Sequence, residues 1–296
     1  MRALIPQDLD ILHCSVPEEN LPAWNAGTTY AAKDQVIRNH YIFEALGETR
    51  GEDPWDNHGF MNAPWRSLGP TAPYQCLDDK LHTQTEAPEG QTQLTVTVPY
   101  ARPSTGFGVL NMTAASSAVA TLRDVDGKIM WQRERSLIEG TYGCYRYFFD
   151  PFRCVRDAVE VGLPGYSGTL TVTLYGPRPA LGMIVVGEAV QLGVTRFGPS
   201  FGFKDYSVSS ADEYGNLTYL ERKKAKIGTF TVYIRPEELD YVYFRVMEIG
   251  KRPTLWMGDD GVGFQSMLVF GRLKEFDPTL SAYSYGEATF DLEGTV

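Results

Sequence analysis

The 296-residue chain lacks a long hydrophobic run. A membrane-spanning helix needs about 20 successive apolar residues, and the richest apolar stretch, residues 182–194, is interrupted by Gly187 and Glu188. At the N-terminus the apolar run Ala3-Leu4-Ile5 stops at Pro6, whereas a secretory signal needs an apolar region of about 7–15 residues. We therefore expect neither a membrane-spanning helix nor a signal peptide.

Cysteine and histidine are scarce. The four cysteines are widely scattered without a Cys-x-x-Cys pair, and the four histidines lack the spacing of metal ligands. We expect free thiols in a protein made in the cytoplasm, and we expect no metal site and no cofactor.

Positive charge is also in short supply. The chain has 27 Lys and Arg against 37 Asp and Glu, which gives a formal net charge of −10. A nucleic-acid binder needs a basic face that releases phosphate counterions, and docking on an anionic membrane needs basic residues too. The composition therefore argues against both nucleic-acid and membrane partners.

Aromatic residues, glycine and proline are abundant. The chain contains 17 Tyr, 15 Phe, 29 Gly and 18 Pro, a composition typical of β-rich, turn-rich proteins. From residue 91 onward, short segments alternate polar and apolar residues, as in Gln93–Val98, and Asp126-Gly127 is a favourable hairpin turn. Strand-length segments recur about every ten residues, which favours a sandwich over βαβ units.

The expected fold class is all-β with minor α: a small N-terminal β module, a central antiparallel β-sandwich and a C-terminal β domain with one helix. We divide the chain into a lead-in segment (1–20), the small β module (21–75), the sandwich (76–178) and the C-terminal domain (179–296). Residues 236–249 predict the helix, because proline and two glutamates begin it, glycine follows it, and apolar residues recur at helical spacing.

The N-terminal module contains a set of aromatic and polar residues in a recognisable order: Trp24, Tyr30, Asp34, Val36, Tyr41 and Trp65. With these residues the region resembles the small chitin-binding modules of bacterial chitinases. The resemblance implies a small β unit, with a short hairpin across Arg38-Asn39 and a core built on Trp24, Tyr30 and Trp65. It also implies sugar binding, for which the candidate residues are Trp24, Tyr30, Tyr41, Trp55 and Trp65.

Two positions depart from the pattern of those modules. The sugar-binding rings of the family follow the last strand, where this chain has Ala45-Leu46-Gly47, and Lys33 replaces a glycine. Trp55 is then either a substitute sugar platform or a packing anchor.

The module is followed by Pro64–Tyr74 and, further along, by Gly182–Thr195 and Glu221–Lys226. These segments resemble patterns in proteins of tailed bacteriophages and prophages, in the tail tip or baseplate. The resemblance implies a structural, adhesive virion subunit, located in the tail and not an enzyme. Its partners would be other tail or baseplate proteins, copies of itself as a trimer or hexamer, and a host surface glycan. The alternatives are a carbohydrate-binding receptor protein and, third, an enzyme acting on surface polysaccharide.

Motifs for catalysis are not apparent. No serine lies in a Gly-x-Ser-x-Gly elbow, and adjacent carboxylates such as Asp78-Asp79 do not by themselves form a glycosidase pair. The candidate interface residues are instead an aromatic strand and a basic run, either of which suits a protein partner: Tyr145, Arg146, Tyr147, Arg222, Lys223 and Lys224. The other interpretation of the basic run is an edge strand that lysines protect from pairing.

Overall fold

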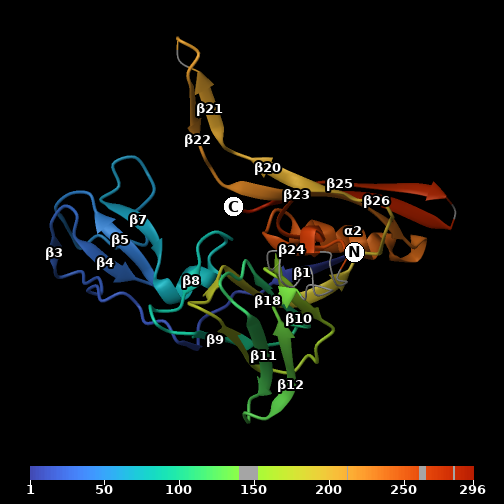
Figure 1. Ribbon diagram of the computed structural model, residues 1–296, viewed down its shortest axis with the longest axis horizontal. Helices are drawn as coiled ribbons and strands as arrows, with labels where there is room; N and C mark the ends of the chain where they lie inside the picture. Colours follow the sequence, from blue (N-terminus) through green and yellow to red (C-terminus); the bar gives the residue numbers. More distant parts are fainter. Residues whose placement is uncertain (140–152, 212, 260–264, 283) are drawn as a thin grey trace, which may run out of the picture.

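The computed structural model describes residues 1–139, 153–211, 213–259, 265–282 and 284–296. The protein is all-β with minor α, as predicted: 51% of it is strand and 8% is helical. Figure 1 shows a small module on one side, a central sandwich, and a C-terminal part from which a narrow arm projects. Among the described residues no helix is long and apolar enough to cross a membrane.

The largest sheet contains ten strands within the described residues, and each pair of neighbouring strands in it is antiparallel. In spatial order they are β15 (Ala158–Val161), β10 (Gly106–Leu110), β18 (Met183–Gln191), β1 (Arg2–Pro6), β24 (Thr254–Met257), β25 (Leu268–Ala282), β26 (Tyr285–Gly294), β23 (Lys224–Ile234) and β19 (Val194–Thr195), with β20 (Ser200–Asp205) also pairing with β23.

The position of β1 corrects one prediction. Residues 1–20 were expected to be a lead-in segment, yet β1 lies inside the large sheet, with Leu4 opposite Ala189 on β18 and Leu255 on β24. Leu4 is fully buried. The strand ends at Pro6, because proline has no N–H group to continue the hydrogen-bonded ladder. The sequence around Pro6 did not predict this strand.

A second sheet of five strands forms the other layer of the sandwich, in the order β12 (Ile129–Ser136), β11 (Ser117–Asp124), β16 (Gly168–Tyr175), β9 (Gln93–Tyr100) and β2 (His13–Cys14). The predicted Asp126-Gly127 turn joins β11 to β12, and Gly127 has a positive φ of 81°. The predicted strand at Cys144–Phe149 lies outside the described residues.

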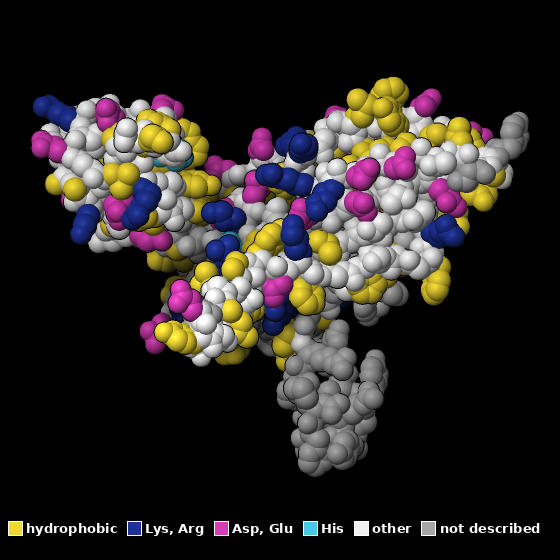
Figure 2. All heavy atoms as spheres, turned by 90° about the horizontal axis from the view of Figure 1, so that it is seen from above, with side chains coloured by type: hydrophobic (Ala, Val, Ile, Leu, Met, Phe, Trp, Pro, Cys, Tyr) yellow, Lys and Arg dark blue, Asp and Glu magenta, His cyan; other side chains and the backbone are white. Residues whose placement is uncertain are grey.

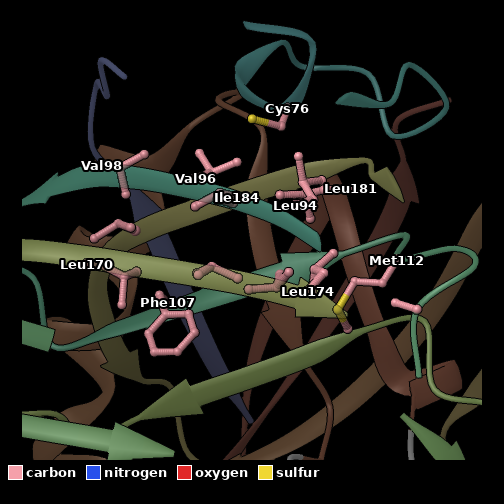
Figure 3. Packing of buried hydrophobic residues seen from close by; sticks show 14 of the residues in the cluster. Cys76, Leu94, Val96, Val98, Phe107, Met112, Leu170, Leu174, Leu181 and Ile184 are labelled. Carbon is pink, nitrogen blue, oxygen red and sulfur yellow. The ribbon is translucent and has the colours of Figure 1, made fainter. Parts of the chain in front are cut away.

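The sandwich core lies between this sheet and the β15-β10-β18 part of the large one. Leu94 and Leu170 from one layer and Phe107 and Ile184 from the other belong to one buried cluster (Figure 3). Because β18 lies beyond residue 178, the sandwich does not end at the predicted boundary. Prolines 177 and 179 lie between β16 and β17 (Ala180–Leu181), but the hydrophobic core continues past them.

The N-terminal module consists of a three-stranded sheet and a two-stranded one: β4 (Gln35–Arg38), β5 (Tyr41–Ala45) and β7 (Trp65–Pro70), and β3 (Thr29–Tyr30) with β6 (Thr49–Arg50). The β4–β5 hairpin is one residue out of the predicted position. Its two turn residues are Asn39 and His40, both with positive φ, which is the geometry of a tight two-residue hairpin loop.

Short elements connect these layers: η1 (Ala72–Leu77), β8 (Thr85–Glu86) with β17 (Ala180–Leu181), β13 (Ile138–Glu139) with β14 (Arg153–Cys154), and η3 (Gln265–Met267). The predicted helix is present as a 3-10 turn, η2 (Pro236–Glu238), followed by α2 (Leu239–Ile249). Val242, Val246 and Ile249 bury its inner face against the C-terminal half of the large sheet.

The arm consists of β20 and of a two-stranded ribbon that lies beyond it. Beyond β20 and β23, the chain continues as a two-stranded ribbon of β21 (Val208–Ala211) and β22 (Leu217–Leu220), which Figure 1 shows standing away from the body. We use the word arm for β20, β21, β22 and their connecting residues up to Lys223.

Candidate interaction surfaces

Two of the rings predicted to bind sugar are buried in the module. Trp65 is 1% exposed and Tyr30 is 6% exposed, and their ring centroids lie 5.4 Å apart in an edge-on contact. The indole nitrogen of Trp65 donates to the Glu52 carbonyl at 3.0 Å. Both rings are therefore core residues, and the prediction that they bind sugar is corrected: a module this small needs its largest rings to form its own core.

The other three predicted rings do not form one flat platform. Trp24 is half-buried with the Arg38 guanidinium 5.2 Å from its ring centroid. Trp55 is 43% exposed and stands edge-on to the half-buried Tyr41, with centroids 5.4 Å apart. Asp53 holds the Trp55 loop, because it pairs with Arg38 at 2.8 Å and accepts the Trp55 N–H at 3.0 Å. Of this set, Trp55 alone offers a substantial exposed ring.

The basic run lies where the arm joins the body. Arg222 and Lys223 occupy the bend between β22 and β23, and both are exposed together with Lys224. The bend is held by backbone contacts, since the Tyr206 N–H donates to the Lys223 carbonyl at 3.3 Å. At Lys224 and Lys226 the strand β23 pairs only with β20, because its pairing with β26 begins at Ile227. The other interpretation of the basic run, an edge that lysines protect from pairing, therefore agrees with this part of the sheet.

Figure 2 looks down on the side from which the arm projects. Several Lys and Arg side chains gather near the middle of this face, with hydrophobic side chains around them. The remaining predicted interface residues, Tyr145, Arg146 and Tyr147, lie outside the described residues.

One carboxylate adds side-chain contacts to the β20–β23 ladder that joins the base of the arm to the body. Glu293 on β26 accepts from Lys204 and Tyr206 of the arm at 3.0 and 2.9 Å, and pairs with Lys274 of β25 at 3.1 Å. Hydrogen bonds from these three side chains, that of Lys204 being the strongest cause, lower the pKa of the Glu293 carboxyl from 4.5 to about 2. The carboxylate is therefore ionised in the folded protein over nearly all accessible pH values.

This arrangement predicts acid-sensitive attachment of the arm. A carboxyl whose folded pKa is depressed stabilises the fold above its unfolded pKa of 4.5, and this contribution is lost as the pH falls toward about 2. We expect the amide protons of β20 to lose hydrogen-exchange protection in that window before those of β11 do. In Glu293→Gln the protection of β20 is expected to be lower than in the wild type already at pH 6. Equal loss in both strands of the wild type would contradict the prediction.

The arm exposes an unusual amount of apolar surface. All residues of β20, β21 and β22 are exposed. The large apolar side chains among them are 46–77% exposed: Phe201, Phe203, Val208, Leu217, Tyr219 and Leu220. The sequence analysis did not predict that both faces of this ribbon would remain exposed.

A second apolar surface lies on the outer side of α2, and the sequence analysis missed it. Tyr241, Phe244 and Met247 are 53%, 66% and 61% exposed, and their spacing of three residues places them on one side of the helix. We call these three side chains the α2 stripe. The spacing that revealed the inner face of the helix contains this second set as well, so the stripe was readable from the sequence.

Among the described residues, no group of three or more His, Cys, Asp or Glu side chains is placed to hold a metal ion. The fold and its surfaces define an all-β, multi-module protein with a projecting apolar arm. No protein-family model matches the chain, and no curated protein is found to be similar to it. The resemblance to chitin-binding modules and to phage tail proteins therefore depends on the motif residues alone and stays a prediction.

Proposed function

We propose that the chain is a structural and adhesive subunit of a bacteriophage tail tip or baseplate, which assembles with copies of itself and with other tail proteins and contacts a host surface glycan. The exposed arm is the observation that carries the proposal. An isolated two-stranded ribbon is only marginally stable in water, and β21 and β22 are exposed throughout. Contiguous exposed apolar surface is typical of protein–protein contact sites, so a neighbouring subunit would stabilise the ribbon.

Self-association is supported by the presence of two unlike apolar surfaces on one chain. The arm projects away from the body, whereas the α2 stripe lies on a helix packed against the large sheet. When one copy contacts a different surface of the next, the contacts close into a ring if the rotation between copies permits. The proposed trimer or hexamer would be a ring of this kind.

We expect the double substitution Leu217→Asp and Leu220→Asp to convert the oligomer to monomers. The two side chains are 77% and 56% exposed, so the charges leave the fold intact but oppose burial of the ribbon against another subunit. Light scattering on the purified protein measures the mass. The matched control is Val125→Asp, at a side chain that is 80% exposed on the β11–β12 turn, and it is expected to keep the oligomer.

A wild-type protein that stays monomeric at high concentration, alone and with tail proteins from the same genome, would overturn the proposal. Electron microscopy supplies the second test. The subunit is expected at the distal end of a purified tail particle, and the double variant is expected to be missing from assembled particles.

A further inference from the structure

A cleft of about 460 Å³ lies beside the base of the arm, and the proposed assembly does not use it. Its volume is in the range of about 300–1,000 Å³ that small-ligand pockets occupy. Its walls come from six separate parts of the chain, including the end of β10 and the starts of β23 and β25. The apolar part of the lining includes the half-buried Leu81 and three side chains that are at most 8% exposed, Leu110, Leu268 and Phe270.

The charged lining is strongly one-sided. Four Lys or Arg side chains face one carboxylate side chain: Arg156, Lys223, Lys224 and Lys226 against Asp157. The chain as a whole carries a net charge of −10, so this concentration of positive charge is a local exception. A cleft lined by one sign of charge focuses the field and attracts ligands of the opposite sign.

The single carboxylate is already committed to the wall of the cleft. One Asp157 oxygen accepts from Lys226 at 2.6 Å and the other accepts from the Asn111 N–H at 2.9 Å. Lys226 also donates to the Gln265 and Leu268 carbonyls, each at 3.3 Å. The pair of Asp157 and Lys226 thus holds the wall of the cleft in place, and Asp157 is not available to neutralise the other cations.

Arg156 and Lys223 are exposed and form no ion pair with another described residue. Lys224 is 3.5 Å from Asp205. The cleft therefore presents at least two cationic side chains to solvent next to apolar surface and next to the neutral polar side chains of Gln265 and Ser266. An inorganic anion needs only the cations, whereas a sugar acid needs all three: charge for its acid group, hydrogen-bonding groups for its hydroxyls and apolar surface for its C–H face.

We propose that this cleft binds a negatively charged sugar unit, whose charge is a carboxylate or a phosphate. Arg156 and Lys223 hold the acid group, and the half-buried Leu81 contacts the sugar ring. The origin of the sugar in a host surface glycan rests on the proposed function. The binding of a negatively charged sugar does not depend on the proposed function, because it follows from the residues that line the cleft.

The test is isothermal titration calorimetry with four probes: galacturonate disaccharide, glucose 6-phosphate, the neutral disaccharide cellobiose and inorganic phosphate. At least one of the two acidic sugars is expected to bind, more tightly than cellobiose and than inorganic phosphate. Arg156→Gln and Lys223→Gln are each expected to weaken this binding by about tenfold or more, because each removes a charge-assisted hydrogen bond. The control is Lys251→Gln, at an exposed cation outside the cleft.

Every outcome decides between the alternatives. Binding of the uronate alone or the phosphate ester alone identifies which acid group the cleft accepts. The proposal is overturned if neither acidic sugar binds, if inorganic phosphate or cellobiose binds equally well, or if the two cleft variants bind like the control. Light scattering on the same samples separates this result from the proposed function, since Arg156→Gln, at a residue outside the predicted interface, is expected to keep the mass of the wild-type assembly.

Discussion

Gly187→Ala is expected to destabilise the body of the protein by at least about 3 kcal/mol, at the upper end of the cost of overpacking. A Cβ atom at this position would lie 1.8 Å from the Ile5 carbonyl oxygen and 2.7 Å from the Ile5 carbonyl carbon. Both atoms belong to the backbone of β1, so no side-chain rotation relieves the clash. Strand β1 would have to move away from β18 in the middle of the large sheet.

Chemical denaturation followed by circular dichroism measures this loss, and hydrogen exchange shows whether the amides of β1 lose protection first. The matched control is Gly202→Ala in β20, where the nearest atom to an added Cβ is 3.8 Å away. This control is expected to stay within about 0.5 kcal/mol of the wild type. If the two glycine variants unfold at the same denaturant concentration, β1 does not occupy the position described above.

Trp65→Ala is expected to unfold the N-terminal module and to leave the sandwich folded. Loss of a buried tryptophan typically costs about 3–5 kcal/mol, and the buried core of the module consists of only five side chains: Tyr30, Val36, Phe43, Ala45 and Trp65. The substitution also leaves the Glu52 carbonyl without its indole donor. A core of this size has little reserve of stability.

Limited proteolysis is the direct measurement, with cleavage expected inside residues 21–75 and a protected fragment from the remainder of the chain. Trp55→Ala is the control, because its ring is 43% exposed and its loss is expected to leave the module resistant. Protection of the module in Trp65→Ala would show that other contacts hold it together. Cleavage throughout the chain would show that the module and the body unfold as one unit.

The strands that the sequence predicted well are those with one buried face. Gln93–Val98 was expected as a strand and is found within β9, where buried residues alternate with less buried ones. The helix at 236–249 was equally predictable, since its inner residues recur at helical spacing and its ends carry proline and glycine. In both elements the spacing of apolar residues in the sequence indicates which face contacts the core.

Pairing between distant segments could not be predicted in this way. Five residues of β1 contain no alternation that identifies their neighbours, and these neighbours are β18 and β24, more than 180 residues away. The same reason explains the misplaced boundary at residue 178. The prolines near residue 178 indicate a local break in the chain. The sandwich core is nevertheless completed by β18, which follows that break in the sequence.

The candidate surfaces were predictable to different degrees. The basic run Arg222–Lys224 is visible as a cluster of charges, and its exposure follows from composition. The cleft beside it is not visible, because Arg156 and Lys223 are separated by more than 60 residues and meet only through the packing of β10, β23 and β25. The core predicted on Trp24, Tyr30 and Trp65 is found for Tyr30 and Trp65, which are buried, whereas Trp24 is half-buried.

The central position of β1 constrains the order in which the protein completes its fold during synthesis. Its partners are residues 183–191 and 254–257, so the ribosome must deliver most of the polypeptide before this strand has both neighbours. The module at 21–75 closes on itself much earlier, because its strands pair only with one another. Nascent chains therefore carry one finished unit beside an incomplete sheet whose unpaired edges are prone to aggregation.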